Sequence, residues 1–289
     1  MPRIHKLCSL IAGVLLVLPA AIAASQPARS IDPVESAQRQ ITGYLSNLAD
    51  LHCTELVTQE KLAPNGHVVA SERDKYDYLI MMNGSGDDFQ LNETRLESSP
   101  GKSRKSSSPM LVSNGMATVL LVFHPYYRES FKFESGTEEM VDGKPAIPVH
   151  FTHIPGRRTP AALALRGREY PLELQGTAWL DKQSGEVVKI EAGLNRDMSD
   201  VGLSSLNVHV EYKPANIGKA VSTINLPALA VVDVTTPRQH WRNTHAFDSY
   251  KSFSTDAVQD PKVKVRAENA VPDKNDTAAA IRSDSKEKP

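Results

Sequence analysis

Apolar and polar residues alternate with a period of two over most of the chain, the pattern of strands in a sheet that buries one face. The clearest example is residues 175–191, where two arms rich in β-favouring residues flank Asp181-Lys-Gln-Ser-Gly185. Asp181 can bond the backbone two residues on, and Gly185 can adopt a left-handed conformation. This stretch therefore predicts a hairpin around which the rest of the sheet is organised.

The turn suggests how the two arms of this hairpin pair. If Asp181 pairs with Glu186, the facing pairs are Trp179 with Val188 and Thr177 with Ile190. A slip of one residue would turn these side chains to the other face of the sheet, so the register stays a prediction.

Further stretches with the same alternation predict the other strands, mostly with turn residues between them. Pro145 and Pro148 indicate that the strand around Val149 lies at a sheet edge or carries a bulge. The predicted strands are residues 53–62, 68–82, 89–96, 131–133, 147–151, 206–213, 229–234 and 247–253.

A helix is predicted from Asp32 to about Asp50. Asp32 can cap it, Pro33 fits its first turn, and Glu35 can complete a capping box. An apolar stripe at spacings of three and four would dock it on the sheet, formed by Val34, Ala37, Ile41, Tyr44, Leu45 and Leu48.

A second, shorter helix is predicted before Pro125, and it is apolar on nearly every side. Leu121 and Val122 leave little of its second face polar. Such a helix is either part of the core or a lid over an apolar cavity, and the sequence leaves both interpretations open. The residues that share its first face are Val112, Met116, Val119, Leu120 and Phe123.

The two ends of the chain differ from the β region. Residues 1–23 have a short basic start, an apolar run and Ala21-Ile22-Ala23, and this order predicts an export signal cleaved near Ala23. The apolar run is too short to span a bilayer, so no transmembrane anchor is expected after cleavage. We therefore expect a periplasmic or secreted protein with one β domain over residues 24–265 and a disordered charged tail over residues 266–289.

Charge and cysteine content exclude some functions. Without residues 1–23 the chain has 31 basic and 34 acidic residues, which gives no support to nucleic-acid binding. Cys53 is then the single cysteine, so no internal disulfide can form, and we expect a buried thiol rather than a nucleophile.

No motif for catalysis or metal binding stands out. The sequence lacks the Gly-x-Ser-x-Gly motif of a nucleophile elbow. His150 and His153 would point to opposite faces of one strand, as would His240 and His245. We therefore predict no catalytic residues, no metal and no cofactor.

The order of these elements and the hairpin motif resemble the LolA/LolB-type periplasmic lipoprotein carriers, a superfamily that includes RseB-type sensors. Uncharacterised exported relatives of that superfamily are more similar still. The resemblance covers roughly Pro33 to Val265. The matching residues are Trp179-Leu-Asp181, Ser184-Gly185-Glu186-Val187, Ile190, Tyr212, Leu226-Pro227 and Tyr250-Lys-Ser-Phe253.

The resemblance implies a mainly β (α+β) fold. A single curved antiparallel sheet would form an incomplete barrel, with an N-terminal helix and a short apolar lid helix. It also implies a non-enzymatic protein that binds a lipid or a lipoprotein acyl chain on an apolar concave face. The expected ligand contacts are Met116, Val119, Leu120 and Phe123 on the lid, and Trp179, Val188 and Ile190 on the sheet.

Two other functions remain open at this stage. One is a protein-interaction or sensor module that docks an envelope protein and holds no lipid. The other is a hydrolase whose catalytic residues are dispersed along the sequence.

Overall fold

The computed structural model describes residues 32–48, 51–83, 90–97, 113, 116–165, 168–216 and 223–252. The predicted export signal and the predicted charged tail lie outside the described residues.

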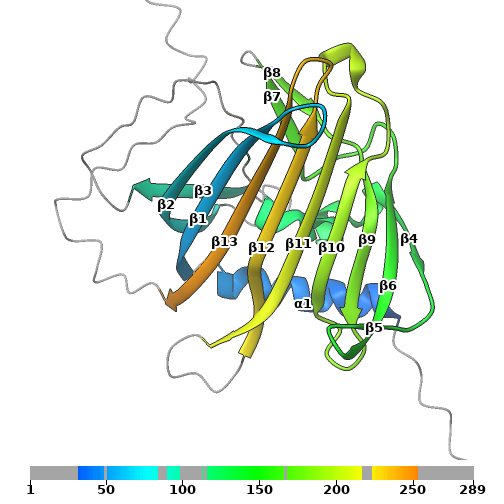
Figure 1. Ribbon diagram of the computed structural model, residues 1–289. Coiled ribbons are helices and arrows are strands. Elements are labelled where there is room, and N and C mark those ends of the chain that lie inside the picture. Colours follow the sequence, from blue (N-terminus) through cyan, green and yellow to red (C-terminus); the bar gives the residue numbers. More distant parts are fainter. Residues whose placement is uncertain are drawn as a thin grey trace, which may run out of the picture. The chain divides into compact units, whose positions relative to one another are not determined.

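One large antiparallel sheet of eleven strands dominates the described part of the chain (Figure 1). Its last strand, β13, pairs with β1, so the two ends of the β region meet in the middle of the sheet. In spatial order the strands are β3 (Gln90–Glu97), β2 (Val68–Asn83), β1 (Leu51–Leu62), β13 (His240–Ser252), β12 (Thr223–Thr235), β11 (Ser205–Asn216), β10 (Val187–Leu194), β9 (Leu174–Asp181), β6 (Lys144–His153) and β4 (Phe131–Ser135), with β5 (Glu139–Val141) also on β6.

Strands β3 and β4 are the two edges of this sheet, so it does not close into a barrel. The predicted class, a mainly β protein with one open antiparallel sheet and an N-terminal helix, is confirmed. A separate hairpin of β7 (Ala162–Leu165) and β8 (Arg168–Pro171) was not predicted, because its sequence suggests a connection rich in arginine.

Helix α1 (Pro33–Leu48) begins as its capping residues predict. The Val34 N–H donates to Asp32 Oδ1 at 3.0 Å, which satisfies one of the unpaired amides of the first turn. The predicted stripe is buried at Val34, Ala37, Ile41 and Leu45. No helix in the described part of the chain has the length and apolar character needed to cross a membrane.

Helix α1 and the short 3₁₀ helix η2 (Met116–Phe123) pack on one face of the sheet, called the inner face here (Figure 1). A single row of directly paired residues crosses seven strands on this face, and every one of them is buried. Six of the seven are apolar. The row consists of Val57, His245, Ala230, Val210, Ile190, Ala178 and Val149.

The central hairpin has the predicted turn but a different register. The Asp181 N–H donates to the Glu186 carbonyl at 2.8 Å, as predicted. A bulge then inserts one extra residue at Val188, which shifts every later pair by one. Trp179 therefore pairs with Lys189 and Thr177 with Glu191, so both predicted pairings with Val188 and Ile190 are wrong.

The two prolines of β6 do not place it at an edge, since β9 pairs on one side and β4 and β5 pair on the other. The irregularity lies instead in the segment that pairs with β6. Residues 136–138 interrupt the pairing between β4 and β5 opposite Pro148. The missing amide of Pro148 therefore faces a gap in the ladder, where it costs no strand hydrogen bond.

The apolar segment before Pro125 forms the 3₁₀ helix η2 instead of the α-helix that the spacing suggests. It ends at Phe123, and Pro125 begins the next 3₁₀ helix, η3 (Pro125–Ser130). Residues Val119 to Phe123 are all buried, so η2 has no exposed side among these residues.

The tip of the central hairpin contacts α1, and Gly185 makes this contact possible. Gly185 has φ +73°, and a Cβ at that position would lie 2.0 Å from Ser36 Oγ on α1. Gln40 Nε2 donates to the Ser184 carbonyl at 2.9 Å, which fixes the same contact.

We predict that Gly185→Ala lowers the free energy of unfolding by about 2–4 kcal/mol, measured by urea denaturation. The matched control is Gly66→Ala, which has φ +83° and no atom within 4 Å of the added Cβ. That control should cost only the backbone term of about 1–2 kcal/mol. Equal losses in the two variants would contradict the contact between the hairpin and α1.

Candidate functional site

A small cavity lies between α1, η2 and the inner face. Its volume is about 110 Å³. The residues that line it come from the helices and from the sheet. Most are apolar or aromatic, among them Ile41, Tyr44, Leu120, Val187, Tyr212 and Ile224. The cavity is therefore a gap in the apolar core at the place where η2 covers the sheet.

Two tyrosines face each other at this cavity. The rings of Tyr44 and Tyr212 pack edge to face with centroids 6.5 Å apart. Burial raises the pKa of both phenols above the ordinary value, so both carry a neutral hydroxyl at neutral pH. The buried Tyr44 hydroxyl has no hydrogen-bond partner among the described residues. The cavity thus has mainly apolar and aromatic walls, and Gln40, Glu186 and Asn225 line it besides the two tyrosines.

The structure brings together four of the seven predicted ligand contacts on the inner side of the sheet. Val119, Leu120, Phe123 and Ile190 all belong to the same buried core cluster. Phe123 stacks on Phe133, with ring centroids 5.2 Å apart. Met116 begins η2, but its side chain lies outside the described residues.

The other two predicted contacts lie elsewhere. Trp179 pairs with Lys189 and Pro148, on the face of the sheet opposite to Ile190. The Lys189 ammonium lies 3.7 Å from its ring centroid, and its indole N–H donates to Glu139. Val188 is the half-buried extra residue of the bulge. The predicted register did not include this bulge, and it therefore placed both side chains on the same face as Ile190.

A buried polar chain also lies on the inner face, and the sequence analysis missed it. Arg95 makes a bidentate ion pair with Glu55, with Nε–Oε2 at 2.5 Å and Nη2–Oε1 at 2.7 Å. His245 Nδ1 lies 2.8 Å from Glu55 Oε1, and its Nε2 lies 2.7 Å from Ser113 Oγ. Asn243 Nδ2 donates to the same Ser113 oxygen at 2.8 Å.

Glu55 is 0% exposed and sits at the centre of this chain. Burial by itself would raise the pKa of its carboxyl group. Hydrogen bonds from Arg95 and His245, together with the charge of Arg95, outweigh burial and lower that pKa below its ordinary value. Glu55 is therefore ionised at neutral pH.

The polar chain could not be found by motif, because its members come from distant parts of the sequence. One signal was present. Glu55 lies between Cys53 and Val57, at a position where the alternation of β1 requires an apolar side chain. A charged residue in such a position predicts a buried partner.

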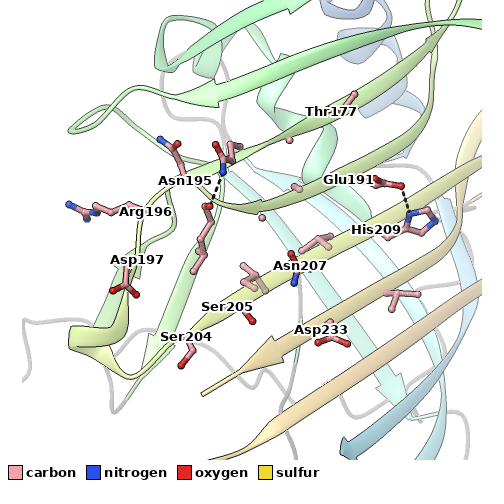
Figure 2. Close-up of a pocket in the computed structure, with 18 residues that line it drawn as sticks. Thr177, Glu191, Asn195, Arg196, Asp197, Ser204, Ser205, Asn207, His209 and Asp233 are labelled. Atoms are coloured by element: carbon pink, nitrogen blue, oxygen red, sulfur yellow. Dashed lines mark hydrogen bonds and ion pairs between the residues drawn. The ribbon is translucent and has the colours of Figure 1, made fainter. Parts of the chain in front are cut away.

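A larger hollow lies on the opposite face of the sheet, across β9 to β12 (Figure 2). It has a volume of about 850 Å³ and is open to solvent. Figure 2 shows polar side chains around it, among them Thr177, Glu191, Asn207, His209 and Asp233. His209 Nδ1 lies 3.4 Å from Glu191 Oε1, and Arg242 Nη2 lies 2.8 Å from Asp233 Oδ2.

Two predictions are confirmed: His150 and His153 lie on opposite faces of one strand, and Cys53 is buried. His150 is exposed and His153 is buried, as expected for opposite faces of one strand. No group of three possible metal ligands gathers among the described residues. Cys53 is buried, and burial raises the pKa of its thiol to about 12, so it is not a thiolate nucleophile at neutral pH.

No protein-family model matches the chain, and no curated protein matches it. Three solved structures illustrate what it is similar to. A DUF1329 family protein from Desulfovibrio piger is 11% identical, with a TM-score of 0.39, over 79% of this chain and 100% of that one. A putative outer membrane lipoprotein-sorting protein domain from Vibrio parahaemolyticus is 11% identical, with a TM-score of 0.38, over 77% and 92%.

The third is the complex of MucA and MucB from Pseudomonas aeruginosa, at 10% identity and a TM-score of 0.19, over 76% of this chain and 99% of that one. All three likenesses are at 10–11% identity.

We predict that Glu55→Gln lowers the free energy of unfolding at pH 7 by about 2–4 kcal/mol, because it removes the carboxylate charge that the half-buried Arg95 pairs with. The pKa of Glu55 is lowered on folding, so its contribution is present above its ordinary pKa and is lost as the pH falls through the lower folded value. Urea denaturation should therefore show the gap between wild type and variant closing in acid.

The double variant Glu55→Gln with Arg95→Met removes both charges of the ion pair. It should lose less stability than the two single losses added together. Additive losses, or a gap that does not change with pH, would contradict the coupling described for Glu55.

Proposed function

We propose that this protein binds a lipid or a lipoprotein acyl chain between η2 and the inner face of the sheet, and that it acts after export from the cytoplasm. The observation that supports this best is the apolar helix η2 itself. It covers β10, β11 and β12 and adjoins a cavity lined mainly by apolar and aromatic residues.

The size of the cavity implies that η2 moves when the ligand binds. Ligand pockets usually measure about 300–1,000 Å³, whereas this cavity measures about 110 Å³. An acyl chain therefore fits only if η2 shifts away from the sheet. The 3₁₀ geometry favours such a shift, because its hydrogen bonds are poorer than those of an α-helix.

The energetics of such a binding mode are simple. Each methylene group that leaves water contributes about 0.8 kcal/mol, so a long acyl chain can repay the cost of uncovering part of the inner face. After η2 shifts, the ligand would take over the contacts that Leu120 makes with the sheet beside the cavity. The Tyr44 hydroxyl would offer a hydrogen bond to a polar group of the ligand.

We predict that Ala37→Leu weakens binding of a fluorescent long-chain fatty acid at least tenfold. Ala37 lies on α1, lines the cavity and is 1% exposed, so the larger side chain fills space that the ligand needs. Fluorescence titration measures the affinity, and urea denaturation should show that the variant is no less stable than wild type.

The matched control is Arg39→Leu, which places the same side chain at an exposed position of the same helix that does not line the cavity. It should change the free energy of unfolding by less than about 0.5 kcal/mol and leave the affinity unchanged. Equal affinities for Ala37→Leu and the control would count against this cavity as the binding site. Failure of the wild type to bind any long-chain lipid would favour the alternative, a module that docks an envelope protein.

A further inference from the structure

The inner face carries three side chains in the order that a nucleophilic site requires. Ser113 Oγ lies 2.7 Å from His245 Nε2, and His245 Nδ1 lies 2.8 Å from Glu55 Oε1. Ser113, His245 and Glu55 are 8%, 2% and 0% exposed, respectively. A nucleophile within hydrogen-bond reach of a base that a third group orients is the general signature of covalent catalysis.

The hydrogen bonds are also compatible with the protonation pattern that a general base needs. Ionised Glu55 can only accept, so His245 Nδ1 carries a proton and donates it. Asn243 Nδ2 donates to Ser113 Oγ, and the serine hydroxyl can donate its own proton to His245 Nε2 when the imidazole is neutral with its proton on Nδ1. Nε2 is then the acceptor, as needed for a general base that takes the serine proton.

Arg95 completes the arrangement from the edge strand β3. Its bidentate contact with Glu55 compensates the buried carboxylate and fixes its two oxygens. Glu55 is thus held in place to orient the imidazole and to stabilise its charged form. Arg95 is a positioning residue, since it acts through Glu55.

We propose that Ser113, His245 and Glu55 form an acyl-transfer site that cleaves ester ligands bound on the inner face. This inference rests on the proposed function, because the substrate would be an ester of the same apolar acyl chain. The prediction of a non-enzymatic protein would then be wrong. The protein would be a hydrolase with dispersed catalytic residues, the other function that the sequence leaves open.

In the first half of the reaction, Ser113 Oγ attacks the carbonyl carbon of the ester while His245 Nε2 takes the hydroxyl proton. The bond from that carbon to the alcohol oxygen then breaks, and the alcohol leaves with the proton from Nε2. The acyl group remains on Ser113. Asn243 Nδ2, already 2.8 Å from Oγ, is within reach of the oxyanion that forms on the substrate.

In the second half, a water molecule gives a proton to His245 Nε2 and attacks the acyl carbon. The bond to Ser113 breaks, Oγ regains the proton, and the carboxylic acid is released. The sum is ester plus water to acid plus alcohol. Because Ser113 is only 8% exposed, water reaches it poorly, so we expect the acyl form to accumulate.

The position of Ser113 suits a long acyl chain. His245 pairs with Ala230 on β12, and Asn225 of the same strand lines the cavity under α1. Ala230 and Asn225 are about 16 Å apart along β12, at roughly 3.3 Å per residue. A chain whose carbonyl lies at Ser113 would therefore run under η2 toward the cavity.

The proposal is tested by incubating the purified protein with p-nitrophenyl palmitate and, separately, with a fluorophosphonate probe. Wild type should release a burst of about one p-nitrophenol per protein. Peptide mass spectrometry should locate both the acyl group and the probe on Ser113. Label on another residue, or no label at all, would overturn the proposal.

Variants separate chemistry from folding. Ser113→Ala and His245→Gln should reduce the rate of labelling at least 1,000-fold while their circular-dichroism spectra stay those of wild type. Ser113→Cys should keep acylation through a thioester. The control is Ser130→Ala, which removes another buried hydroxyl and should label like wild type. Unchanged labelling of Ser113→Ala would contradict the proposed nucleophile.

Titration with the fluorescent fatty acid distinguishes the two proposals. If wild type and Ser113→Ala bind it equally and Ser113 is never acylated, the catalytic inference fails and the binding function stands. If Ser113 is acylated but no fatty acid binds, the catalytic site stands and the proposed binding function fails.

Discussion

The structure depends on covering the apolar inner face of an open sheet. A closed barrel would bury such a face by itself, but here the edges β3 and β4 do not meet. The row of paired side chains from Val57 to Val149 can leave water only if other elements pack on it. Helix α1 and the 3₁₀ helix η2 provide this cover, and the tip of the central hairpin fixes α1 through Gly185.

The two elements that cover the inner face are held on it by different interactions. Helix α1 has a capped start, an apolar stripe and hydrogen bonds to the hairpin, so the sequence and the sheet both stabilise it. Helix η2 packs on the sheet mainly through the apolar side chains of Val119 to Phe123, and the Leu120 backbone also hydrogen-bonds Tyr212. In the proposed binding mode, the apolar ligand takes the place of η2 and not of α1, since the ligand offers the same kind of contact as η2.

A second constraint comes from the buried charges beside η2. Glu55 is tolerable on the inner face because Arg95 and His245 satisfy it, and Ser113 and Asn243 extend the same chain. This chain connects the edge strand β3, through β1 and β13, with the residue that precedes η2 by a few positions. The polar and the apolar parts of the inner face therefore meet where the proposed ligand would lie.

The sequence predicts the fold well where one period continues without interruption. The alternation along β11 and β12 and the stripe of α1 gave elements that the structure contains. Prediction from the sequence fails where a local irregularity, such as a bulge, breaks this period. One extra residue at Val188 moved Trp179 to the other face, and the apolar segment of η2 fitted several helical forms equally well.

The candidate site was predictable only in part for the same reason. Apolar contacts such as Leu120 and Ile190 follow from local patterns, because burial repeats along an element. The polar chain joins residues up to 190 positions apart, and nothing in a local pattern relates Glu55 to His245. A charged residue at an inward position signals that a partner exists, but only the fold identifies it.

The most direct test of the central claim is mass spectrometry of an organic extract from the exported protein, purified without detergent. The account predicts a lipid or acyl chain in about equimolar amount, absent from an unrelated periplasmic protein treated in the same way. An empty protein with an intact β-type circular-dichroism spectrum, which also fails to take up added lipid, would contradict it.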